Sequence, residues 1–141
     1  MRKNEKITLV KEAIHNPNEP RHYMTISKSN KTWYAKLGSR RLAESNRVLE
    51  LREVGYSIYS SVIYFPSDCV DSNVLKKNKK NTHCPLKGTT CYFDLISSEV
   101  KVIDVAWTYE NTISKAAIIK NMAAFDAKKI MIGIADHPAD T

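Results

Sequence analysis

The sequence has no long apolar run, only three cysteines, and no spacing among them that marks a disulfide framework. Its apolar runs are too short to span a bilayer, which takes roughly 20 consecutive residues. Met1 to Lys6 carries charges with no apolar stretch behind them, so we expect no signal peptide. An odd number of cysteines without framework spacing favours free thiols in a reducing compartment. We therefore expect a cytoplasmic protein with no membrane partner.

The spacing of a metal site is missing as well. The potential thiol and imidazole ligands are Cys69, His83, Cys84 and Cys91, but no two cysteines have the Cys-x-x-Cys spacing of a zinc knuckle. Adjacent side chains such as His83 and Cys84 rarely bind one ion together. We expect no metal site and no cofactor.

Positive charge is concentrated in one segment. The chain has 22 basic and 15 acidic residues and a net charge of +7. The segment Lys76–Lys80 contributes four lysines, and without them the net charge is 7 − 4 = +3. One interpretation is a solvated, mobile loop that keeps the protein soluble. The alternative, which we favour less, is a module that uses these lysines to contact nucleic acid or a protein.

Alternating apolar residues predict several short strands separated by turns. Residues 48–53 fit either a strand or a helical turn, and residues 67–90 look long and irregular. Helical spacing is predicted for residues 7–14 and again from Asn111 or Thr112 to Asn121, where either side chain can cap a helix. The predicted strands are 33–37, 42–45, 58–65, 91–96, 100–103, 105–109 and 129–134.

This order of elements predicts a mainly β fold. Six to eight short strands with one short helix in the C-terminal third are typical of an antiparallel sheet that folds on itself under a helix. A chain of 141 residues suits one domain with one core. We expect an N-terminal extension over residues 1–29, a single domain over residues 30–134 and a disordered tail over residues 135–141.

The segment from His83 to Phe93 carries the most reactive groups in the chain. It places a thiol, an imidazole, an ammonium and two hydroxyls on a loop with Pro85 and Gly88, immediately before an apolar strand. Cys84 is the candidate catalytic residue, because a nearby cation such as Lys87 increases the thiolate fraction of a thiol. The alternative is that Cys84 is a small buried residue that packs the loop.

Six residues are candidates for ligand binding. Lys87, Thr89 and Tyr109 supply polar groups, and an ammonium beside backbone N–H groups in a glycine-containing turn favours an anionic ligand. Most aromatic side chains at strand spacing belong to a core, but a pocket in a curved sheet needs a few of them. The complete candidate set is Lys87, Gly88, Thr89, Tyr92, Trp107 and Tyr109.

An ordered set of motifs resembles a known bacterial family, domain of unknown function four-two-seven. The motifs are Leu42–Ser45 followed by Leu49–Leu51, Tyr64–Pro66, Asp68–Val70, Cys84–Gly88, Tyr92, Ala106–Tyr109, and Ile119 with Ala123 and Phe125. They cover roughly residues 30–134, and Cys-Pro-x-Lys-Gly is the most specific. This chain has Leu86 where the family usually has an aromatic residue, and it lacks the prolines that the family often has near Ser57 and Tyr59.

The resemblance implies a β-tent fold, the folded antiparallel sheet of the Mss4-like group. The family is uncharacterised and carries a nucleotidyltransferase-like label, which these residues do not support. Such enzymes need paired carboxylates at x-Asp-x-Asp spacing to hold two metal ions, whereas Asp68 and Asp71 are three residues apart. A glycine-rich phosphate loop is also missing.

The leading hypothesis is a small domain that binds a small molecule, anions included, in a pocket formed by the Cys84–Gly88 loop. The first alternative is an enzyme that uses Cys84 as a nucleophile or redox thiol. The second is the interaction module at Lys76–Lys80. The sequence leaves open which of these holds, the identity of the ligand and the oligomeric state.

Overall fold

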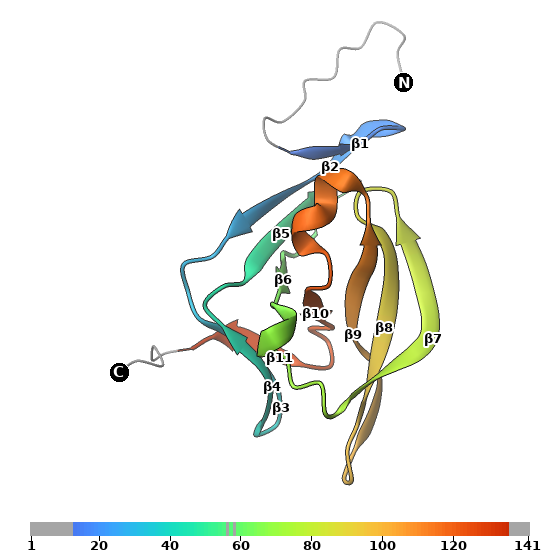
Figure 1. The fold of residues 1–141 in the computed structure, drawn as a ribbon. Coiled ribbons are helices and arrows are strands. Elements are labelled where there is room, and N and C mark those ends of the chain that lie inside the picture. Colours follow the sequence, from blue (N-terminus) through green and yellow to red (C-terminus); the bar gives the residue numbers. More distant parts are fainter. Residues whose placement is uncertain (1–12, 56, 58, 136–141) are drawn as a thin grey trace, which may run out of the picture.

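A computed structural model describes residues 13–55, 57 and 59–135 of the chain. This part contains eleven β-strands and two short 3-10 helices, η1 and η2 (Figure 1). In chain order they are β1 (Ile14–Asn16), β2 (Glu19–Lys28), β3 (Trp33–Leu37), β4 (Arg40–Ser45), β5 (Leu49–Val54), β6 (Val62–Tyr64), η1 (Ser67–Cys69), β7 (Leu75–Cys84), β8 (Gly88–Ile96), β9 (Lys101–Thr112), η2 (Ser114–Ile119), β10 (Ala123–Phe125) and β11 (Met131–Ile134). The prediction of a mainly β, antiparallel fold is confirmed.

The strands form three antiparallel sheets, two of which meet along an edge. We call β1-β2-β5-β6 the N-terminal wing and β10-β9-β8-β7 the C-terminal wing, each in its sheet order. Backbone hydrogen bonds between Phe65 and Ala123 join the wings where β6 ends and β10 begins. In Figure 1 the wings diverge from this junction, and η2 (orange) lies above it. The third sheet, β11-β3-β4, lies below.

Side chains of successive strand residues point to opposite faces, and the C-terminal wing therefore contributes to two cores. Ala106 packs into one core, whereas its neighbour Trp107 packs against the other. The core that draws on both wings, which we call the inter-wing core, consists of Met24, Leu49, Leu51, Tyr64, Leu86, Tyr109, Ala116, Ile119 and Ala124. Full burial of a side chain such as Leu86 or Ile119 stabilises the fold by roughly 1.5–3 kcal/mol.

The predicted hairpins are present. β3 and β4 pair around a turn at Gly38, whose φ of +60° suits glycine, and β8 pairs with β9 around residues 97–100. The predicted strand over residues 105–109 is the continuation of β9, which begins at Lys101. Of residues 48–53, which fit either a strand or a helical turn, residues 49–53 lie in β5, and the strand predicted over 129–134 corresponds to β11, which begins at Met131.

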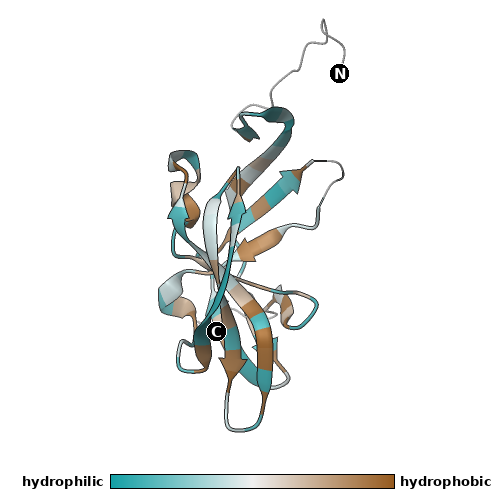
Figure 2. Ribbon diagram, turned by 90° about the vertical axis from the view of Figure 1, so that its right-hand side faces the viewer, coloured by the Kyte–Doolittle hydropathy of each residue, from teal (hydrophilic) through white to brown (hydrophobic). Residues whose placement is uncertain are grey.

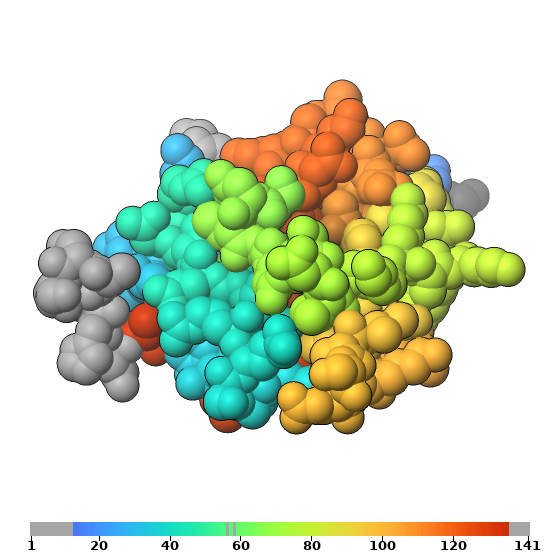
Figure 3. All heavy atoms as spheres, turned by 60° about the horizontal axis from the view of Figure 1, so that its bottom comes forward, coloured from blue at the N-terminus to red at the C-terminus, as the bar shows by residue number. Residues whose placement is uncertain are grey.

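The prediction of an irregular segment over residues 67–90, with a mobile lysine run, is wrong. Ten of these residues form β7, which pairs with β8 along the outer edge of the C-terminal wing. Figure 2 looks onto this edge, and the side chains of β7 project from the right of the surface in Figure 3. The Lys77 ammonium lies 2.8 Å from Glu110, and that of Lys80 lies 3.4 Å from Asp104. Lysines on an exposed edge strand discourage pairing with another chain, which accounts for the charge without a ligand.

The predicted C-terminal helix is shorter than expected and of a different type. Asn111 and Thr112 pair with β8 as part of β9 and do not cap a helix. The helical segment is η2, a 3-10 helix of six residues that buries Ala116 and Ile119. These two residues are three apart, which matches the three-residue turn of a 3-10 helix as well as it matches an α-helix.

The N-terminal part of the described chain is integrated into the fold. Ile14, which the sequence predicted at the end of a helical segment, begins β1, and residues 7–12 of that segment lie outside the described residues. Within the predicted extension, β2 pairs with β5 over six residue pairs. Of the predicted tail, residues 136–141 lie outside the described residues. In the described part, no helix is both long and apolar enough to cross a bilayer.

Candidate functional site

A cavity of about 520 Å³ lies where the β1–β2 hairpin meets the end of β5. Its volume falls within the range of roughly 300–1,000 Å³ that is typical of small-molecule sites. The wall combines charged, polar and aromatic groups with one glycine. The lining residues are Asn16, Glu19, Arg21, His22, Glu53, Gly55 and Tyr59.

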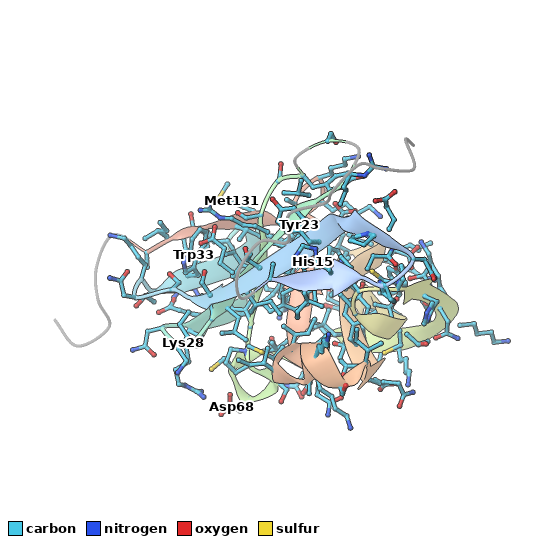
Figure 4. All side chains as sticks on the ribbon, turned by 90° about the horizontal axis from the view of Figure 1, so that it is seen from above. His15, Tyr23, Lys28, Trp33, Asp68 and Met131 are labelled. Atoms are coloured by element: carbon cyan, nitrogen blue, oxygen red, sulfur yellow. The ribbon has the colours of Figure 1, made fainter. Side chains whose placement is uncertain are left out.

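The two-residue period of the strands places Glu53 and His22 on the same face of the N-terminal wing. Along β5, Glu53 follows Leu49 and Leu51, both of which are buried in the inter-wing core. On the adjacent β2, His22 precedes the buried Met24. Tyr23 points to the opposite face, where its ring lies 5.2 Å from that of His15 (Figure 4). The strand pattern therefore positions a carboxylate and an imidazole at the edge of the core.

Glu53 is held by one hydrogen bond at each carboxylate oxygen. The Lys87 ammonium donates to Oε1 at 2.8 Å, and His22 Nε2 lies 2.7 Å from Oε2. The side chains of Lys87 and Glu53 are only 11% and 21% exposed. Because Glu53 belongs to the N-terminal wing and Lys87 precedes β8 in the C-terminal wing, this ion pair links the two wings beside the inter-wing core.

The hydrogen bonds around His22 determine which ring nitrogen carries the proton. The backbone N–H of Asn18 donates to Asn16 Oδ1 at 3.0 Å, which leaves the Asn16 amide nitrogen facing His22 Nδ1 at 3.2 Å. An amide nitrogen only donates, so Nδ1 accepts, and Nε2–H donates to Glu53. Both ring nitrogens of His22 are therefore occupied, and the imidazole links Asn16 to Glu53.

The surroundings keep Glu53 and Lys87 charged. Burial by itself raises the pKa of Glu53, but hydrogen bonds from Lys87 and His22 outweigh burial and hold that pKa below its usual value. Burial opposes the Lys87 ammonium as well, yet the Tyr109 hydroxyl and the hydrogen bond to Glu53 raise the pKa of Lys87 above its usual value. The Lys87 ammonium also lies 5.8 Å from the centroid of the Tyr109 ring, within cation–π range.

The predicted ligand-binding residues divide into separate groups, and none of them lines the cavity. Lys87 and Tyr109 are together, and the buried Lys87 faces Glu53 instead of open space. The rings of Tyr92 and Trp107 form a second pair 6.5 Å apart, and Trp107 donates to the Tyr64 hydroxyl at 3.3 Å. Thr89 lies apart from both groups, exposed, with its hydroxyl 3.3 Å from His83 Nδ1.

Gly88 and Cys84 both lie close to other parts of the fold. Gly88 has a φ of +130°, and a Cβ atom there would lie 2.0 Å from the carbonyl oxygen of Asn111. Cys84 is half-buried and packs against the inter-wing core. In the described part of the chain, the Cys84 thiol makes no hydrogen bond, and the imidazole of His83 faces Thr89. Within the described residues no base is hydrogen-bonded to this thiol, but the Lys87 ammonium lies close enough to interact with it electrostatically.

Sequence reasoning missed Glu53, His22 and Asn16. A signal existed for Glu53, because alternation with Leu49 and Leu51 places an ionisable group on the apolar face of a strand. The sequence has no comparable signal for His22 and Asn16, because both lie within residues 1–29, where an extension is expected. Within the described ranges, no group of three or more His, Cys, Asp or Glu side chains is arranged to hold a metal ion.

One comparison with known proteins identifies the family. The model of a domain of unknown function (DUF427), labelled NTP_transf_9, matches residues 25–136. No curated protein matches the chain. The matched region contains Glu53, Lys87 and Tyr109, whereas Asn16 and His22 precede it. The match covers most of the chain, and the protein therefore belongs to the DUF427 family.

Proposed function

We propose that this protein is a cytoplasmic domain that binds a small molecule in the cavity beside Glu53. The observation that carries the proposal is the carboxylate itself: a half-buried, ionised group that lines a cavity of about 520 Å³. Lys87 and His22 hold both of its oxygens, so a ligand would not have to order the side chain on binding. Fixed polar groups beside an apolar core are the usual composition of a small-molecule site.

In this proposal the Cys84–Gly88 loop supports the site without lining it. The loop carries Lys87, whose charge keeps Glu53 ionised, and Leu86, which is fully buried in the inter-wing core. An anion at Lys87 would have to displace Glu53, a partner already 2.8 Å away and covalently tethered to the fold. The geometry therefore favours recognition at Glu53 over anion binding at Lys87.

We also propose that the two wings are the two slopes of a β-tent. Three observations support this assignment: the antiparallel order of both wings, their junction between Phe65 and Ala123, and a core with residues from both wings. The cavity then lies at one end of the tent, next to the ion pair that connects the slopes. A folded sheet of this kind leaves its concave face to a ligand and a few covering residues.

Blocking the cavity tests the proposal. Gly55 lines the cavity, and the atoms nearest to a Cβ placed there belong to His22 and Tyr59, two other lining residues, at 3.4 Å or more, so a larger side chain would enter the free volume. We expect ligand-observed NMR with a fragment set to show binding to the wild type, and Gly55→Leu to abolish it. Ser98→Leu, at an exposed hairpin turn, is the matched control and should bind normally. Equal binding by both variants would contradict the proposed location.

A further inference from the structure

The hydrogen-bonding groups around the cavity are unevenly used. On the donor side, His22 Nε2 and the Lys87 ammonium are directed at Glu53, and the Asn16 amide nitrogen is directed at His22. Arg21 donates from Nε and Nη2 to the two oxygens of Glu19, at 3.0 and 3.1 Å. Each of these donor groups therefore already has at least one acceptor within the protein.

Acceptor capacity remains at Glu53. Each oxygen of an ionised carboxylate can accept two hydrogen bonds, and each Glu53 oxygen accepts one from the protein. A second carboxylate, Glu19, lines the same cavity. A ligand that brings N–H groups can use these lone pairs, whereas a ligand carboxylate would bring further acceptors to an acceptor. Hydrogen bonds to a charged acceptor are among the stronger ones in proteins.

An aromatic residue, Tyr59, lines the same cavity as this acceptor. The backbone N–H of Tyr59 donates to the carbonyl oxygen of Glu53 at 3.2 Å, and the N–H of Gly55 donates to the carbonyl of Ser57 at 3.0 Å. These bonds turn the chain back after β5, so that Tyr59 and Glu53 line one cavity. A cavity lined by a carboxylate and an aromatic residue suits a ligand with a positively charged nitrogen head group attached to a flat or apolar body.

We propose that the cavity selects small molecules that present a nitrogen head group with N–H donors, such as an amidine or a primary amine, to Glu53. This inference rests on the proposed function and adds the chemical class of the ligand. The charges of Glu53 and Lys87 compensate each other, as do those of Glu19 and Arg21, so selectivity comes from short-range hydrogen bonding to the carboxylate.

Matched probes on one ring test the selectivity. Benzamidine, benzylamine, benzyl alcohol and benzoate share an aromatic ring and differ in the head group. We expect titrations of the full chain, followed by ligand-observed NMR, to give Kd values for benzamidine and benzylamine about tenfold or more below that of benzoate. The double variant Glu53→Gln/Lys87→Met removes both charges without leaving either one unpaired, and it should lose this preference. Glu99→Gln, at an exposed turn, should keep it.

The outcomes separate the two proposals. Benzoate binding that equals or exceeds benzamidine binding, and that is lost in Gly55→Leu, would overturn the nitrogen selectivity and leave the cavity as the binding site. If none of the four probes binds at millimolar concentration, the proposed pocket and the selectivity both fail. If circular dichroism shows that the double variant is unfolded, the loss of benzamidine binding in Gly55→Leu, with retention in Ser98→Leu, decides whether the cavity binds the amidine.

Discussion

Replacement of Lys87 by methionine should destabilise the protein strongly, whereas truncation of a surface lysine usually changes stability by under about 0.5 kcal/mol. Methionine fills a similar volume, so the main effect is the loss of the ammonium. The carboxylate of Glu53, only 21% exposed, would keep His22 as its sole side-chain donor. Breaking a fully buried ion pair in this way costs about 3–5 kcal/mol. For this partly exposed pair we expect about 2–3 kcal/mol.

Urea unfolding followed by tryptophan fluorescence measures this effect, because Trp107 packs against the inter-wing core. The single variant Glu53→Gln should also be destabilised, since it leaves the Lys87 ammonium buried without a carboxylate. In a double-mutant cycle, Glu53→Gln/Lys87→Met should lose about 1–2 kcal/mol less than the sum of the single variants. Lys79→Met, at an exposed position of β7, is the control and should change stability by under about 0.5 kcal/mol.

A Lys87→Met variant as stable as the Lys79→Met control would show that the Lys87 ammonium does not stabilise the fold. Strict additivity in the cycle would also count against the ion pair, because additivity means that Glu53 and Lys87 do not stabilise each other. Either result would mean that the Glu53–Lys87 ion pair does not link the wings.

Four further outcomes follow from the structure. Gly88→Val should lower the free energy of unfolding by about 1–3 kcal/mol or more in urea titrations, because of its positive φ and the Asn111 carbonyl, and an unchanged stability would count against this geometry. Glu53 has a lowered pKa in the fold, so its contribution to the free energy of unfolding is complete above the ordinary pKa of 4.5 and is lost as pH falls through the pKa of the folded state. When the free energy of unfolding is measured across this pH range, it should vary less for Glu53→Gln/Lys87→Met than for the wild type. Iodoacetamide should alkylate Cys84 no faster than the half-buried Cys69, whereas the enzyme alternative requires a much faster Cys84. Changing the four lysines of Lys76–Lys80 to serine should leave folding intact but promote aggregation at the β7 edge, measured by light scattering, and a salt-sensitive loss of oligonucleotide binding would instead favour the nucleic-acid alternative.

The strands that the sequence predicted are those whose pattern is local. Trp33, Ala35 and Leu37 alternate with polar residues, and a glycine turn follows them, so β3 and its hairpin can be found without any partner. β7 lacks such a signal, because lysines and asparagines occupy most of its positions. Its extended conformation comes from hydrogen bonding to β8, which a composition pattern does not contain.

The site shows the same division between local and long-range information. The sequence identified Lys87 as a candidate for ligand binding but did not indicate its partner. The structure pairs Lys87 with Glu53, 34 residues earlier in the chain. Only the meeting of the two wings brings these residues together. A single sequence contains no signal of that contact beyond the carboxylate on the apolar face of β5.

Chemical-shift mapping of a bound fragment is the most direct test of the central claim that the cavity beside Glu53 is the binding site. A titration of the isotope-labelled protein with benzamidine, followed by amide proton–nitrogen correlation spectra, reports every backbone amide at once. If the ligand occupies this cavity, the largest shifts should occur at His22, Glu53, Gly55 and Tyr59. Shifts confined to Thr89 and Tyr92, or to the lysines of β7, would contradict it and place the site on the C-terminal wing.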